Sequence, residues 1–271
     1  MRSSQRTQCT RRTQRRQRVS VACTFAIALA LPLAGQAHAE DLFEVQVFHS
    51  RIAPAQKLML ELHSNYVTAS APSVTPPEQP SGGVLFQQIE PSYGIAPHTE
   101  VAVHFKHAID AHGVTWGGVV VRGMTLLRDA QDSPVKIGIN VEGGYTAARF
   151  DPARWIAELR PVIEWEDGLR DIDLNPVVAF RFTGADRGIP MFQPSVSTRV
   201  IIAQVVAPGV EYYADFGPVS DFLPLAQQHH YGFVTADILA SRRWPIHFGA
   251  GAGLTPASSR AIITILVGHE F

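Results

Sequence analysis

The residue types that most often carry out chemistry are spread through the chain without forming a specific motif. Four serines and two histidines are the candidates for the nucleophile and base of a hydrolase: Ser195, Ser197, Ser258, Ser259, His247 and His269. No G-x-S-x-G elbow or other defined spacing connects them. The sequence therefore favours a protein that is not an enzyme and leaves a lipid-modifying hydrolase as the weaker alternative.

Metal and cofactor motifs are also missing from the sequence. The chain has 11 histidines, two of them adjacent at His229 and His230, but no H-E-x-x-H or comparable ligand spacing. The glycine-rich stretch 249–253 lacks the lysine of a phosphate loop and any dinucleotide pattern. Both cysteines, Cys9 and Cys23, lie in the N-terminal region that we expect to be removed. We therefore expect neither a metal site nor a cofactor.

Charged residues instead recur at every second position, which places them on one face of a β-strand. Both signs of charge are interleaved on this face, and the intervening positions are apolar. Buried charges need partners, so the set fits an interior filled by ion pairs, which we favour, or a polar pore that binds a small solute. The residues that we assign to this interior are Glu61, Glu100, His104, Lys106, Arg122, Lys136, Asn140, Glu142, Glu158, Arg160, Glu164 and Arg181.

Alternation of this kind predicts about twelve strands. Most of these segments are longer than the ~5–6 residues typical of soluble strands and approach the ~9–11 residues that cross a bilayer at a tilt. Long and short connections tend to alternate between them, as in outer-membrane barrels. The expected strands are 57–67, 84–93, 99–107, 115–127, 135–145, 154–165, 171–183, 195–205, 209–216, 230–240, 246–254 and 261–271.

Two tryptophans favour a membrane barrel over a soluble sandwich, whose strands also alternate. Trp155 and Trp165 share the apolar face of one expected strand. At ~3.3 Å per residue and a tilt of about 40°, they lie roughly 25 Å apart along the membrane normal, which is the height of the apolar band. We therefore expect one indole at each interface of the bilayer, the alternative being two tryptophans in a protein core.

The N-terminal region has the three parts of a secretory signal peptide. Residues 1–39 contain seven arginines, then an apolar stretch from Val19 to Leu33, and end in Ala37-His38-Ala39. The apolar stretch is too short for a transmembrane helix. We expect residues 1–39 to be cleaved, 40–56 to form a periplasmic N-terminal lead-in, and 57–271 to form the barrel.

Cleavage changes the charge of the protein. Loss of the seven arginines leaves 16 basic residues against 24 acidic ones, a net charge near −8. Such an acidic chain is an unsuitable partner for nucleic acid.

The C-terminal strand carries a family resemblance. Ile263, Ile265 and Val267 share one parity beneath a terminal Phe271, which resembles the signal by which the barrel-assembly machinery recognises outer-membrane barrels; His269 departs from that pattern. Segments 90–95, 138–142 and 210–217 resemble those of uncharacterised proteobacterial outer-membrane proteins, similar to the "transporter" barrels of the MetA pathway of phenol degradation. The resemblance implies a Gram-negative outer-membrane location, with outer-membrane lipid and the assembly machinery as partners and Phe271 as an assembly determinant.

The sequence thus predicts an all-β fold, a transmembrane antiparallel up-and-down β-barrel of about twelve strands. Its expected task is passive transport or binding of a small solute. The alternatives are a structural or interaction barrel with a plugged lumen, a lipid-modifying outer-membrane enzyme, and a soluble periplasmic β-protein.

Overall fold

We describe a computed structural model of the chain, which places residues 41–71, 80–129, 133–241 and 243–271. The expected signal peptide lies outside these described residues.

The described chain is almost entirely β-sheet. Apart from a single 3-10 turn, η1 (Leu225–Gln227), its regular elements are strands, and no helix among these residues is long and apolar enough to cross a membrane. The strands are β1 (Leu58–Ala69), β2 (Val84–Ala96), β3 (Thr99–Asp110), β4 (Gly113–Arg128), β5 (Val135–Thr146), β6 (Trp155–Glu166), β7 (Arg170–Asn175), β8 (Val178–Arg181), β9 (Pro190–Phe192), β10 (Ser195–Val200), β11 (Val206–Asp215), β12 (His229–Ile238), β13 (Ile246–Gly253) and β14 (Ala261–Glu270).

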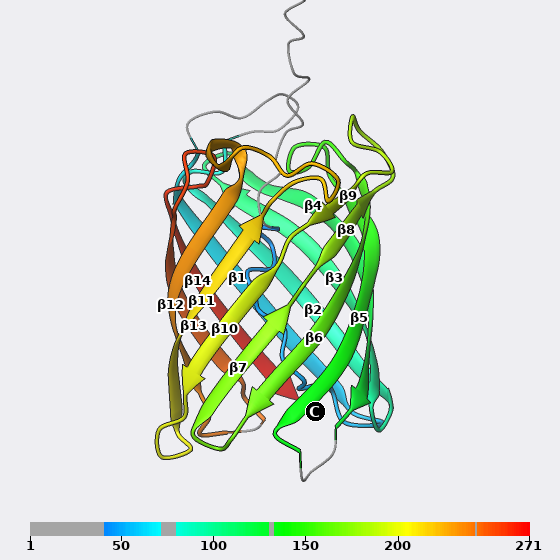
Figure 1. Cartoon of the computed structure of the whole chain (residues 1–271), viewed down its shortest axis with the longest axis vertical. Coiled ribbons are helices and arrows are strands. Elements are labelled where there is room, and N and C mark those ends of the chain that lie inside the picture. The colour runs from blue at the N-terminus through cyan, green and yellow to red at the C-terminus, as the bar shows by residue number, and fades with distance from the viewer. Residues whose placement is uncertain (1–40, 72–79, 130–132, 242) are drawn as a thin grey trace, which may run out of the picture. The chain divides into compact units, whose positions relative to one another are not determined.

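These strands close into one antiparallel barrel (Figure 1). The first strand pairs with the last, with Leu62 opposite Val267. Two of the barrel strands are interrupted: β7 and β8 form one, broken at Pro176, and β9 and β10 form another, broken at Pro194. Proline has no N–H for the hydrogen-bond ladder, so it ends regular pairing. The fourteen segments therefore make twelve barrel strands, which confirms the predicted fold and strand number.

The predicted spans agree with the observed strands to within a few residues, except at 195–205. There the barrel strand begins earlier, with β9 at Pro190, and ends at Val200. The chain then turns over 201–205 with Ala203 and Gln204 in the left-handed region, at φ 50° and 56°. The apolar composition of this segment gave no sign of the turn.

The apolar face of the strands lies on the outside of the barrel. Val121 on β4, Val141 on β5 and Ile263 on β14 are about half exposed, and large apolar side chains follow the same pattern around the wall. Soluble monomers rarely expose apolar patches larger than a few hundred Å². All the described strands belong to one sheet, so no second sheet covers this face. The soluble-sandwich alternative is therefore wrong for the described chain.

The segment before β1 lies inside the barrel, where Figure 1 shows it in blue. Phe43, Val45, Val47, Phe48 and Ala53 are all buried. The expectation of a periplasmic lead-in over 40–56 is therefore wrong for residues 41–56: a run rich in apolar side chains is more stable against the wall than in water. We call residues 41–57 the N-terminal plug.

The plug completes two apolar clusters inside the barrel. One joins Phe43, Val45 and Val47 to wall residues that include Phe86 and Tyr213. The other joins Phe48 to Met124, Leu126 and Val162. The hydrophobic core of this protein is thus the contact between the plug and the inner wall.

Candidate functional site: the lumen and its plug

The plug is held by hydrogen bonds between its backbone and polar side chains of the wall. Asn175 bonds Phe48 twice: its Oδ1 accepts from Phe48 N at 2.7 Å, and its Nδ2 donates to Phe48 O at 2.9 Å. Ser50 N donates to Glu164 Oε2, and Ala53 N to Glu100 Oε2, each at 2.6 Å. These bonds satisfy backbone groups that lie outside regular secondary structure.

Near its C-terminal end the plug contacts the backbone of β2 directly. Gln56 N donates to Gly94 O at 2.7 Å, and Gly94 N donates to Lys57 O at 3.1 Å. A Cβ on Gly94 would lie 2.1 Å from the carbonyl oxygen of Pro54. Only glycine lets the two backbones approach this closely.

An ion network surrounds the middle of the plug. Arg122 contacts Glu90 at 2.5 Å and Glu100 at 2.8 Å, and Arg160 contacts Glu158 at 3.0 Å. The Phe48 ring lies close to both guanidinium groups, 5.3 Å from that of Arg122 and 4.4 Å from that of Arg160. Cation–π attraction adds to the apolar burial of this ring.

The same network reaches the start of the plug. Lys106 forms an ion pair with Asp41, and Glu44 lies 3.5 Å from Nδ1 of His104, measured from its Oε2. The side chain of His104 is completely buried. The plug therefore supplies two of the carboxylates that the basic residues of the wall face.

A second network belongs to the opposite part of the wall. Arg199 contacts Asp171 at 2.7 Å, Asp173 at 2.6 Å and Asp237 at 3.0 Å. Asp237 also contacts Nδ1 of His247 at 2.9 Å. One arginine with three carboxylates leaves this region acidic.

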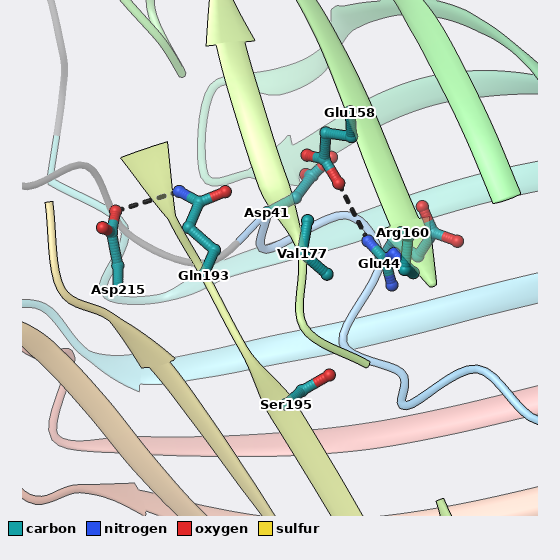
Figure 2. Close-up of a pocket in the computed structure, with 8 residues that line it drawn as sticks. All are labelled: Asp41, Glu44, Glu158, Arg160, Val177, Gln193, Ser195 and Asp215. Carbon is teal, nitrogen blue, oxygen red and sulfur yellow. Dashed lines mark hydrogen bonds and ion pairs between the residues drawn. The ribbon is translucent and has the colours of Figure 1, made fainter. Parts of the chain in front are cut away.

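A small polar pocket remains between the plug and the wall. Figure 2 shows its lining, in which Gln193 bonds Asp215 at 2.9 Å and Arg160 pairs with Glu158. Four carboxylates and one guanidinium line it, together with an amide, a hydroxyl and one apolar side chain: Asp41, Glu44, Glu158, Asp215, Arg160, Gln193, Ser195 and Val177. The pocket is polar and carries an excess of negative charge.

All the residues predicted from the sequence to face the interior lie on the inner side of the wall. Glu100, His104, Arg122, Glu142 and Arg160 come together around the plug. Lys136 pairs at 2.7 Å with Glu164, which also accepts a hydrogen bond from Ser50 of the plug. Arg181 pairs with Asp186 of the following loop at 3.3 Å, apart from the main network. Lys106, Asn140 and Glu158 are also part of the network around the plug, and Glu61 lies on the inner face of β1.

The plug residues themselves are not predicted from the sequence. The run Phe43-Glu44-Val45-Gln46-Val47 alternates like a strand, and this could have indicated a segment between an apolar and a polar surface. No turn joins this run to a partner strand, so its alternation does not identify it as one of the expected barrel strands.

The aromatic residues assigned to interfaces point outward or lie at an end of the wall. Trp155 is about half exposed, with its ring centroid 5.5 Å from that of Tyr145. Trp165 lies near the other end of β6, with the Arg170 guanidinium 5.3 Å from its ring. Phe271 is exposed, and its N–H donates to Leu58 O at 2.9 Å.

Three of the four serines considered as nucleophiles have partners of other kinds, and Ser195 lines the pocket. Ser197 Oγ donates to Asp173 at 2.9 Å, Ser258 Oγ donates to the backbone carbonyl of His230 at 3.0 Å, and Ser259 Oγ lies 3.2 Å from Ser81 Oγ. His247 pairs with Asp237, and His269 packs against Trp244. These contacts give the hydrolase alternative no support.

Comparison with solved structures identifies barrels of the same architecture. The COG4313 outer membrane channel from Pseudomonas putida F1 superposes with a TM-score of 0.59 at 12% identity, over 84% of this chain and 100% of that one. The KdgM porin gives 0.55 at 9% identity, over 79% and 99% of the two chains, and the NanC porin gives 0.54 at 7%, over 78% and 98%. The chain has the fold of these outer-membrane barrels.

At such low identities the likeness establishes the fold alone. No protein-family model matches the sequence, and no curated protein matches it.

Proposed function

We propose that the protein is an outer-membrane channel of a Gram-negative bacterium that carries a small polar solute passively. The observation that carries the proposal is the polar pocket between the plug and the wall. It lies inside a barrel whose outer surface is apolar. A polar interior behind an apolar belt is the arrangement by which porins conduct solutes. The likeness to barrels that are named channels and porins supports it.

The charge of the pocket defines the class of solute. Of the four carboxylates there, Asp41 is paired with Lys106 and Glu158 with Arg160, so Glu44 and Asp215 leave negative charge in excess. A ring of excess negative charge attracts cations and repels anions, so the preferred solutes are small, polar, and neutral or cationic.

Liposome swelling with the purified full-length mature chain tests this proposal. We expect small neutral and cationic amino acids to enter faster than an anionic amino acid of similar size. A reversal-potential measurement in a KCl gradient should show cation selectivity. The Glu158→Gln substitution should reduce this cation selectivity. Asp167→Asn, a substitution in an exposed turn, should leave it unchanged. Equal entry of all solutes at the rate of empty liposomes would contradict transport.

A sealed structural barrel is the second candidate, because the plug fills much of the lumen and is bonded along its length. For a sealed barrel we expect proteoliposomes to be no more permeable to solutes than protein-free liposomes. The interaction surface would then lie on the connections between strands.

Three narrower proposals accompany the main one. We propose a relationship to the MetA-pathway type of barrel, supported by the quoted segments 90–95, 138–142 and 210–217. We also propose that the chain has no catalytic activity, which the serine contacts support. Assembly by the barrel-assembly machinery through Phe271, in outer-membrane lipid, rests on the C-terminal sequence.

A further inference from the structure

The network around the plug contains more acid than base. Six carboxylates, those of Asp41, Glu44, Glu90, Glu100, Glu142 and Glu158, face three permanent cations, those of Lys106, Arg122 and Arg160. Buried charges that lack counterions are costly. The excess of negative charge must be balanced by protons or by a further bound cation.

His104 lies where the excess of carboxylates is greatest. Its Nδ1 is 3.5 Å from Glu44 Oε2 and 3.8 Å from Glu142 Oε2, and its Nε2 is 3.3 Å from Glu90 Oε2. The ring is completely buried, and neither nitrogen has a hydrogen-bond partner of good geometry among the described residues. Within the same part of the chain, Glu44 Oε1 also lacks a partner.

We propose that Glu44, His104 and Glu142 bind a divalent transition-metal ion such as Zn²⁺, which fastens the N-terminal plug to strands β3 and β5. One ligand atom from each residue lies within 4.8 Å of the others. At metal–ligand distances of about 2.0–2.2 Å, tetrahedral ligands are about 3.3–3.6 Å apart, so the observed separations need only a small contraction. Two carboxylates and a neutral imidazole balance the charge of the ion.

The surroundings of the three ligands are those of a metal site. Metal-binding histidines usually direct their second nitrogen at a carboxylate, and here Glu90 occupies that position. Glu142 Oε1 accepts from Asn140 Nδ2 at 3.0 Å, which leaves Oε2 directed at His104. Glu44 lines the pocket, so a water molecule there can complete the coordination of the ion.

The nearby group of Glu61, His63 and Glu90 is a weaker candidate. Its Glu90 is already neutralised by Arg122 at 2.5 Å. The imidazole at His104 favours Zn²⁺ or Co²⁺ over Mg²⁺ or Ca²⁺, which prefer oxygen ligands alone.

Cobalt titration of the chelator-treated full-length mature chain in detergent tests the site. We expect saturable binding of one Co²⁺ with visible d–d absorption, displaced by Zn²⁺. His104→Gln and Glu44→Gln should each weaken it at least about tenfold, since each removes a ligand. His247→Gln, a lumen histidine paired with Asp237, is the matched control and should bind as the wild type does.

Glu44 lies in the plug and not in a barrel strand, so the Glu44→Gln variant tests metal binding even if the His104→Gln variant fails to fold. A second readout is hydrogen exchange of the plug amides. Zn²⁺ should slow it in the wild type and not in Glu44→Gln, because a ligand of the docked state stabilises that state. The proposal is overturned by no saturable Co²⁺ binding in the wild type, or by wild-type affinity in both ligand variants.

Discussion

Asn175 holds the plug by a pair of hydrogen bonds that a single substitution removes. In the wild type, Phe48 donates to and accepts from this side chain, and Asn175 is fully buried on β7. Asn175→Ala leaves the N–H and C=O of Phe48 without these partners inside the lumen.

The two backbone groups of Phe48 that lose their partners determine how much docking free energy of the plug is lost. A buried polar group without a partner costs about 1–3 kcal/mol. Allowing one of the two groups to bond to water, we expect about 2 kcal/mol of lost docking free energy. At about 1.4 kcal/mol per factor of ten, the displaced population of the plug rises roughly 30-fold.

Hydrogen exchange measured by mass spectrometry is the appropriate assay, because amide exchange reports the free energy of local opening. In Asn175→Ala, amides of residues 43–53 should exchange about 30-fold faster, by the same free-energy conversion. Those of the barrel strands should keep their rates. Ser197→Ala is the matched control, since its buried hydroxyl bonds Asp173 of the wall. Unchanged plug exchange in Asn175→Ala, or plug amides that are unprotected in the wild type, would refute the reasoning.

Three further predictions concern the glycine contact, the lipid-facing surface and the second ion network. Gly94→Val places side-chain atoms against the plug backbone and should speed exchange over residues 53–57, whereas Gly123→Val, where a Cβ meets nothing within 4 Å, should not. Val141→Lys puts a charge on the outer face and should lower the free energy of unfolding in lipid by about 2–4 kcal/mol, measured by denaturant titration; an unchanged midpoint would argue against a lipid environment. Arg199→Leu leaves three carboxylates without their cation and should cost about 3–5 kcal/mol. Loss of the exposed Arg170 pair should cost only about 0–1 kcal/mol, and equal losses would contradict the burial of the network.

The barrel could be predicted because alternation has a direct physical cause. Each strand separates an apolar exterior from a polar lumen, so Val141 and Glu142, adjacent in sequence, must lie in opposite environments. That requirement alone identifies the strands and their inner face. The break at Pro176 could not be predicted in the same way, because the alternation on either side of this proline continues in the same parity. The short β9, before Pro194, lies between two expected strands and is not predicted, because three residues show too little alternation to identify a strand.

Contacts across the lumen could not be derived from the sequence. Arg122 on β4 meets Glu90 on β2, two strands away, and such pairs depend on the register and curvature of the closed wall. The plug escapes prediction for a related reason: without a hairpin partner, the alternation of Phe43 to Val47 has no assigned location. The site therefore depends on one segment whose position only the tertiary structure defines.

Single-channel conductance of the full-length mature chain and of a chain lacking residues 40–57 tests the central claim most directly. We expect both to insert into planar lipid bilayers, and the shortened chain to conduct several-fold more because its lumen has lost the plug. Equal conductances, or failure of the folded full-length chain to enter a bilayer at all, would contradict the account.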